Sequence, residues 1–152
     1  MKAIKVGRGF TLIELTLATA VFAILAAVAY PSYRHAVCKA KRTEGRAALM
    51  RLMQQEERYY AQFTSYIAFS SASVDSEEKR FKWYSGDEPR ASAYEIGGTA
   101  CDGESIRDCV ILTAVPGTAR VDSSFDDKDC GRLILTSTGV ESASGGAGDC
   151  WK

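Results

Sequence analysis

The chain has 152 residues, of which 46% are hydrophobic and 25% are charged, and its 19 basic and 19 acidic side chains cancel. The length suits one domain of ordinary size, and the balanced charge excludes a polybasic nucleic-acid binder as the default interpretation. The normal hydrophobic fraction also argues against a wholly disordered chain. A single histidine is too few for a histidine-rich metal site, and the lack of asparagine excludes N-glycosylation.

The charges are distributed unevenly along the chain. Residues 1–9 carry three cations and no acid, residues 10–30 carry one charge, and residues 34–46 carry five cations against one acid. Acidic side chains dominate the remainder. Removal of residues 1–9 would leave 16 basic and 19 acidic groups, so a cut there would give the protein a net charge of −3.

An apolar segment follows the basic leader. Residues 10–30 contain ten large apolar side chains, and neither Gly nor Pro interrupts them before Pro31. A helix of this length spans roughly 30 Å, the thickness of the hydrocarbon core of a bilayer. Insertion of these side chains contributes about −3 to −6 kcal/mol, which exceeds the roughly 2.5–3.5 kcal/mol cost of one carboxylate, Glu14. The segment is therefore predicted to span a membrane.

Three interpretations of this segment compete. It could be a plain signal anchor. It could be a secretory signal that is cleaved after Ala29, in the small-x-small pattern of residues 27–29, which would release a soluble binding module. In the third, a short basic leader ends at Gly9, the apolar run begins at Phe10, and Glu14 is its fifth residue. The third interpretation accounts for the most residues.

The order Gly9-Phe10-Thr11-Leu12-Ile13-Glu14 resembles the signature of type IV prepilins and related pseudopilins. The resemblance implies that a prepilin peptidase cuts between Gly9 and Phe10 on the cytoplasmic side, and that Phe10 is then N-methylated. A carboxylate in a low-dielectric layer needs a cation. The resemblance implies that Glu14 finds this cation in the Phe10 ammonium of a neighbouring subunit and so sets the register of assembly. A pair within one subunit, or an edge charge near lipid headgroups, are the alternatives.

An amphipathic helix is predicted over residues 31–63. Pro31 should end or kink the first half, after which apolar side chains recur at helical spacing. A continuous helix from Phe10 to about Gln62 would be roughly 80 Å long. We define the basic helical cluster as Arg34, Lys39, Lys41, Arg42 and Arg46. It could contact lipid headgroups or DNA, but a solvated face, or one paired with acids of a neighbouring subunit, is favoured.

The remainder, residues 64–152, is predicted to be a small β-rich head. Residues 64–90 are rich in Ser, Asp and Glu and are expected to form a loop. Short alternating runs predict four strands, at residues 93–96, 109–115, 132–136 and 140–142. Their order suggests an antiparallel meander with one face on the helix. The predicted fold class is α+β, with a long N-terminal helix, its apolar first half in the membrane, against a small antiparallel sheet.

Five cysteines are present, and in a head outside the cytoplasm we expect disulfides. Cys101 and Cys109 are placed to close the connection between two strands. Cys130 and Cys150 enclose a loop of about 20 residues, a closure that contributes roughly 3 kcal/mol in the chain-entropy model. Other pairings of these four remain open. Cys38 is left over, as a buried thiol or an intermolecular partner. Zinc is disfavoured, because the chain contains no Cys-x-x-Cys.

Four motifs lie beyond the leader. They are Arg42-Thr43-Glu44-Gly45, Glu57-Arg58-Tyr59-Tyr60, Asp129-Cys130-Gly131-Arg132-Leu133-Ile134-Leu135 with Gly139, and Asp149-Cys150-Trp151-Lys152. Together they resemble PilE-type minor pilins. The resemblance implies the type IV pilin fold and supports pairing of Cys130 with Cys150. Cys101 and Cys109, the unpaired Cys38, and the loop between Phe63 and Arg90 depart from the pattern.

The resemblance also implies a function as a structural subunit. The chain would wait in the inner membrane with its head in the periplasm and then join a cell-surface pilus. Its partners would be other pilin subunits, the prepilin peptidase and methylase, the assembly machinery and inner-membrane lipid; direct nucleic-acid binding is not expected. The fibre would serve twitching motility, adhesion or DNA uptake. A major pilin or a secretion-system pseudopilin is the alternative within the same class.

Two acidic runs are candidates for calcium, which binds oxygen ligands. They are Asp102, Glu104 and Asp108, and Asp126, Asp127 and Asp129. Neither has the order of an EF-hand, so solvated loops are favoured. Ser, Cys and His form no recognisable nucleophile motif, and the sequence predicts neither catalysis nor a cofactor.

Overall fold

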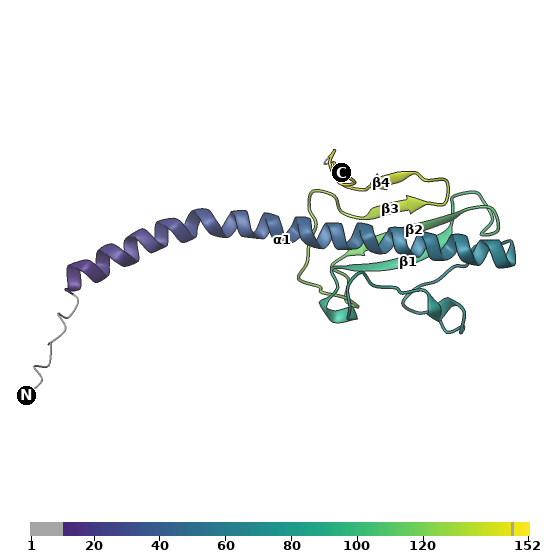
Figure 1. Ribbon diagram of the computed structural model, residues 1–152, viewed down its shortest axis with the longest axis horizontal. Helices are drawn as coiled ribbons and strands as arrows, with labels where there is room; N and C mark the ends of the chain where they lie inside the picture. The colour runs from purple at the N-terminus through teal and green to yellow at the C-terminus, as the bar shows by residue number, and fades with distance from the viewer. Residues whose placement is uncertain (1–10, 147) are drawn as a thin grey trace, which may run out of the picture. The chain divides into compact units, whose positions relative to one another are not determined.

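The computed structural model describes residues 11–146 and 148–152 (Figure 1). Its elements are the long helix α1 (Leu12–Phe63), the short 3-10 helices η1 (Glu78–Arg80) and η2 (Pro89–Ala91), and the strands β1 (Tyr94–Ala100), β2 (Val110–Pro116), β3 (Leu133–Thr136) and β4 (Glu141–Ala143). The chain divides into an N-terminal unit, Met1–Val37, and a C-terminal unit, Cys38–Lys152. The predicted class, a long N-terminal helix with a small antiparallel sheet, is confirmed.

The start of α1 is fixed by a reciprocal cap between Thr11 and Glu14. The Glu14 backbone N–H donates to Thr11 Oγ1 at 3.3 Å, and the Thr11 backbone N–H donates to Glu14 Oε2 at 3.0 Å. Such a capping box satisfies two backbone donors that the first turn of a helix would otherwise leave free. The described helix therefore begins at Leu12.

Pro31 lies inside α1 and does not end it, which corrects one of the two outcomes expected for this residue. A proline removes a single backbone donor, and the residues on both sides of Pro31 keep a helical conformation. In the described part of the N-terminal unit, the side chains of residues 11–36 are exposed. Within the described chain, α1 is the one helix whose length and composition would allow it to cross a membrane.

In the C-terminal unit, α1 packs against the sheet through a stripe of small and aliphatic residues. Gly45, Ala48, Leu49 and Leu52 are buried there. They share one core with the inward-facing residues of the strands, which are Tyr94, Ile96, Val110, Leu112, Ala114, Leu133 and Leu135. A Cβ at Gly45 would lie 2.8 Å from Cδ2 of the Tyr94 ring. Only a glycine therefore permits this close approach of helix and strand.

The sheet is an antiparallel meander in the order β1-β2-β3-β4, as predicted. The register places Ile96 opposite Ala114 and Leu112 opposite Leu135, so one face of each strand points into the core. Strand β1 continues to Ala100, beyond the end expected at residue 96. The reason is that residues 97–100 continue the pairing with β2. On its other side Gly98 forms a bridge with Phe69, whose ring occupies the space that a side chain at Gly98 would need.

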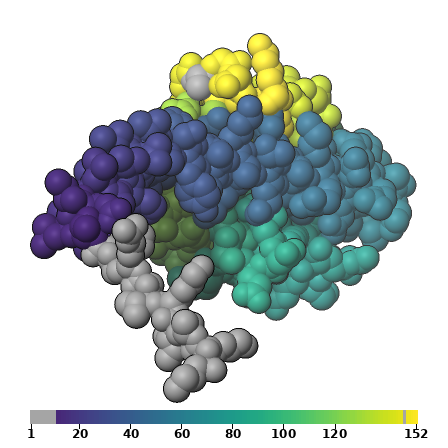
Figure 2. Space-filling model, turned by 60° about the vertical axis from the view of Figure 1, so that its left-hand side comes forward, coloured from purple at the N-terminus to yellow at the C-terminus, as the bar shows by residue number. Residues whose placement is uncertain are grey.

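Residues 64–90 contribute to the core, although the sequence predicted only a loop. Phe69 and Phe81 are buried and stack with ring centroids 5.2 Å apart. A second bridge joins Tyr84 to Glu95 of β1. Figure 2 shows the helical residues of the C-terminal unit between this segment, in teal, and the C-terminal residues, in yellow. The segment is therefore anchored along the edge of the sheet.

Candidate functional site

The expected processing site lies at the N-terminus. Gly9 and Phe10 fall outside the described residues, so cleavage and N-methylation there remain predictions. Glu14 is described and exposed; its Oε2 accepts hydrogen bonds from the backbone N–H and the Oγ1 hydroxyl of Thr11, the latter at 2.8 Å. A role of Glu14 in pairing with the ammonium of another subunit remains a prediction.

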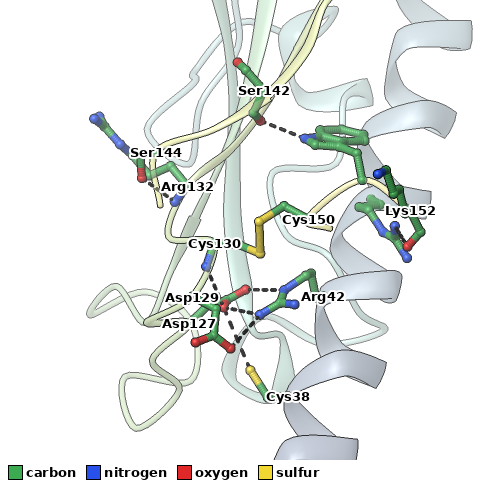
Figure 3. Close-up of a disulfide and its surroundings, with 12 residues drawn as sticks. Cys38, Arg42, Asp127, Asp129, Cys130, Arg132, Ser142, Ser144, Cys150 and Lys152 are labelled. Atoms are coloured by element: carbon green, nitrogen blue, oxygen red, sulfur yellow. Dashed lines mark hydrogen bonds and ion pairs between the residues drawn. A yellow bond between two sulfur atoms is a disulfide. The ribbon is translucent and has the colours of Figure 1, made fainter. Parts of the chain in front are cut away.

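Two disulfides are present in the C-terminal unit. They join Cys101 to Cys109 and Cys130 to Cys150, the pairs considered from the sequence. The first closes the connection between β1 and β2. The second holds the C-terminal residues against the start of β3 (Figure 3). The Trp151 indole N–H donates to the carbonyl of Ser142 at 2.8 Å, which fixes the terminal segment further.

A buried ion pair lies beside the second disulfide, between Arg42 of α1 and Asp127 (Figure 3). The Arg42 Nε and Nη2 atoms donate to the carboxylate at 2.9 and 2.6 Å. The Tyr94 hydroxyl donates to it at 2.6 Å, and the Cys130 backbone N–H donates at 3.2 Å. Burial alone would raise the pKa of Asp127, but the hydrogen bonds from Arg42 and Tyr94 outweigh it and hold the pKa below its usual value.

This pair corrects the expectation for the basic helical cluster. The sequence favoured a solvated face or pairing with another subunit, whereas Arg42 is buried against Asp127 of its own chain. Lys41 also forms an intramolecular pair, with Asp122 at 2.7 Å. The hydrogen bond from Lys41, together with bonds from Ser124, lowers the pKa of Asp122 to about 2. Both cations therefore join α1 to the segment before β3.

The same geometry bears on the second acidic run considered for calcium. Both oxygens of Asp127 already accept hydrogen bonds from protein donors. Across residues 11–146 and 148–152, no three His, Cys, Asp or Glu side chains are grouped so as to hold a metal ion. Asp127 is thus part of the packing of the C-terminal unit.

Cys38 is a free thiol that is half-buried near the same ion pair. Its Sγ donates to Asp127 Oδ1 at 3.9 Å. Burial and the nearby carboxylate raise the pKa of this thiol, so it stays protonated at neutral pH.

Glu56 is a buried acid that the sequence did not single out. It is fully buried on α1, and its Oε2 accepts the backbone N–H of Ile67 at 3.1 Å. Burial raises the pKa of Glu56 to about 7, while its Oε1 has no hydrogen-bond partner in the described chain. The residue therefore ties the beginning of the loop after α1 to the helix.

A basic and aromatic segment, residues 79–84, was also missed. Lys79, Arg80 and Lys82 are exposed, Phe81 is buried, and Trp83 and Tyr84 are half-buried. The Lys82 ammonium lies 4.6 Å from the centroid of the Tyr84 ring, which Trp83 contacts edge-on. The signal in the sequence was the interleaving of cations with aromatic residues, which is typical of nucleic-acid interfaces. The acidic composition of the surrounding loop concealed it.

A pocket of about 340 Å³ adjoins this segment at the end of α1. We call it the Phe63 pocket. Arg58, Tyr59 and Phe63 of α1 line one side, and Arg80 and Phe81 line the other. Cationic and aromatic groups therefore meet in one concave site.

Comparison with known proteins places the chain in a family. The model for the prokaryotic N-terminal methylation motif matches residues 5–30, and the model described as "Type IV minor pilin ComP, DNA uptake sequence receptor" matches residues 31–134. No curated protein sequence matches the chain.

Two solved structures are similar to the chain. One is a type IV pilin from Shewanella oneidensis, with 22% identity and a TM-score of 0.47 over 76% of this chain and 98% of that one. The other is the non-core minor pilin PilV of Neisseria meningitidis, with 20% identity and a TM-score of 0.48 over 75% of this chain and 93% of that one. Because the second family model covers about two thirds of the sequence and the methylation motif precedes it, the chain belongs to the family of type IV minor pilins described as ComP, DNA uptake sequence receptor.

Proposed function

We propose that the chain is a minor subunit of a type IV pilus and that its C-terminal unit binds DNA at the fibre surface. Before assembly, the apolar part of α1 holds the chain in the inner membrane with the C-terminal unit in the periplasm. Cleavage between Gly9 and Phe10 and N-methylation of Phe10 then prepare the helix to pack among other pilins. The exposed apolar side chains of residues 12–30 support this proposal, because they need either lipid or a protein partner.

The alternative of a secreted soluble module predicts a different mature N-terminus. N-terminal sequencing of the purified chain should give N-methylated Phe10 as the first residue, and not Tyr30. A chain that begins at Tyr30 would contradict anchoring by the helix and would support the secreted module.

Glu14 is proposed to set the register of assembly through the Phe10 ammonium of a neighbouring subunit. The substitution Glu14→Ala removes a charge from the apolar segment, so insertion into membranes should be unchanged or improved. Incorporation into fibres should fall, as measured by immunoblotting of sheared pili against the membrane fraction. Thr16→Ala, two residues further along the same helix, serves as a control. Normal incorporation of the Glu14→Ala protein would show that an ion pair between Glu14 and Phe10 is not needed for assembly.

DNA binding revises the expectation that nucleic acid is not a partner. That expectation rested on a net charge of zero, but an interface depends on the local distribution of charge. Residues 79–84 carry three cations and no acid, and the structure exposes all three. The description of the family as a DNA uptake sequence receptor agrees with this local chemistry. The alternation of exposed cations with aromatic side chains in this segment is the observation that carries the proposal.

The test is binding of a labelled DNA duplex to the full chain in detergent, measured at several salt concentrations. A cation that contacts a phosphate releases about 0.9 counterion on binding. The double substitution Lys79→Gln/Lys82→Gln should therefore weaken binding and reduce the slope of log K against log salt by about 1.8. Lys128→Gln is the matched control, because Lys128 is an exposed cation outside the segment. A double variant with the affinity and slope of the unsubstituted protein would refute the assignment.

A further inference from the structure

The Phe63 pocket contains an unusually placed aromatic side chain. Phe63 is the last residue of α1 and is 54% exposed. Among the described residues of the C-terminal unit, it is the one aromatic side chain that is classed as exposed. A single exposed apolar side chain is ordinary on a protein surface, but this ring forms part of the wall of a concave pocket. The position of the ring at the wall of a concave pocket indicates a surface that is available to a ligand.

The Phe63 ring is held by a series of packed aromatic rings. It lies 4.5 Å from the Tyr59 ring, at an interplanar angle of 35°. Tyr59 in turn packs edge-on against the buried Phe81, whose ring stacks on Phe69. Because this series ends in the core, the wall formed by Tyr59 and Phe63 is supported before any ligand arrives. A supported wall loses little entropy when a planar group stacks on it.

Two guanidinium groups border the same pocket. Arg58 Nε donates to the Gln54 carbonyl at 3.1 Å, and its Nη1 and Nη2 have no acceptor in the described chain. Arg80 Nη1 donates to Glu77 Oε2 at 2.8 Å, and its backbone carbonyl accepts the Gln55 side-chain amide at 3.0 Å. Glu77 therefore neutralises Arg80, and the positive charge of Arg58 is left without a paired acid among the residues that line this pocket. Guanidinium groups with free donors match the geometry of phosphate oxygens.

We propose that the Phe63 pocket binds one unpaired nucleotide of DNA. The base stacks on the wall formed by Tyr59 and Phe63, and the phosphate is bound by Arg58 and Arg80. The pocket volume of about 340 Å³ is at the lower end of small-ligand sites. This inference rests on the DNA binding proposed above, and it specifies unpaired nucleotides as a form of DNA that the protein binds. Bases inside a duplex stay stacked and cannot enter, so the pocket serves strand ends and single strands.

The experiment compares a labelled single-stranded 12-mer with a blunt duplex of the same sequence, both bound to the full chain in detergent. Stacking on an aromatic side chain contributes about 5- to 150-fold in affinity per base. Phe63→Leu should therefore weaken single-strand binding by at least about fivefold, and Arg58→Gln should also weaken it. Duplex binding should remain within twofold in both. Val140→Ala and Arg107→Gln are the controls, since these residues are exposed and do not line the pocket.

The outcomes separate the two proposals. Suppose that Phe63→Leu leaves single-strand binding unchanged while Lys79→Gln/Lys82→Gln weakens duplex binding. Nucleotide binding in the Phe63 pocket is then refuted, and DNA binding by residues 79–84 is supported. If single-strand binding depends on Phe63 but the protein binds no duplex, nucleotide binding in the Phe63 pocket is supported and duplex binding by residues 79–84 is refuted. Equal losses for the strand and the duplex in the Phe63 variant would also overturn the preference for unpaired nucleotides. Unchanged tryptophan fluorescence would show that Phe63→Leu, at an exposed position, leaves the fold intact.

Discussion

The substitution Asp127→Ala should strongly destabilise the C-terminal unit. The Asp127 carboxylate accepts five hydrogen bonds, two from Arg42, one from the Tyr94 hydroxyl, one from the Cys130 backbone N–H and a long one from the Cys38 thiol. Its removal leaves a guanidinium that is 10% exposed without its buried counterion. Breaking a buried ion pair by removal of one partner costs about 3–5 kcal/mol. For a unit of this size, the melting temperature should fall by on the order of 10–20 °C.

The assay is thermal and urea unfolding followed by tryptophan fluorescence. Both tryptophans of the chain, Trp83 and Trp151, lie in the C-terminal unit, so the full chain in detergent reports on this unit alone. Because the pKa of Asp127 is lowered, its contribution is present above the unfolded pKa of about 4 and is lost as the pH falls below it. The difference between the two proteins should therefore shrink in acid.

Two further variants distinguish a buried pair from a general effect of lost charge. Asp126→Ala removes a neighbouring exposed carboxylate and should change stability by less than about 1 kcal/mol. The double variant Arg42→Met/Asp127→Ala should be more stable than Asp127→Ala, because it no longer buries a guanidinium whose remaining partner is the exposed Asp129 at 3.4 Å. The reasoning is refuted if Asp127→Ala is as stable as Asp126→Ala, or if the two substitutions in the double variant are additive.

Two other predictions concern buried positions of α1. Because the pKa of Glu56 is raised to about 7, stability should decline by up to ~3 kcal/mol as the pH rises from about 4.5 to 7. In Glu56→Gln, the free energy of unfolding in urea should not decline between pH 5 and pH 7.5. A decline that persists in this variant would show that another group causes it. Gly45→Ala should destabilise by about 1–3 kcal/mol despite the better helix propensity of alanine, because the new Cβ would lie 2.8 Å from the Tyr94 ring. An increase in melting temperature would contradict this close packing.

Local patterns in the sequence were sufficient to predict the helix and the strands of the fold. The helix was expected from residue 10 to about 62 and is described from Leu12 to Phe63, and the four strands lie close to their expected positions. The exception is the far half of β1, where two adjacent glycines gave no strand signal. Gly98 belongs to the strand because it pairs with Leu112 of β2, while Phe69, distant along the chain, bridges to its other side and packs over it.

The candidate site was predictable only in part. The segment 79–84 shows its alternation of cations and aromatic residues in the sequence, and whole-chain charge obscured it. The Phe63 pocket was not predictable, since it joins the end of α1 to residues of η1 and beyond. Two ranges that form one concave surface can be recognised only when the path of the chain between them is known.

The sequence by itself determined the apolar helix, the order of the strands and the prepilin-like leader, because each depends on residues within a few positions of one another. The tertiary structure alone decided that Arg42 pairs with Asp127, 85 residues away, and not with a neighbouring subunit. It also decided that Glu56 is buried and that Gly45 must be a glycine. Periodicity shows which side of a helix is polar, but the partner of a charge depends on which distant segment packs against that side.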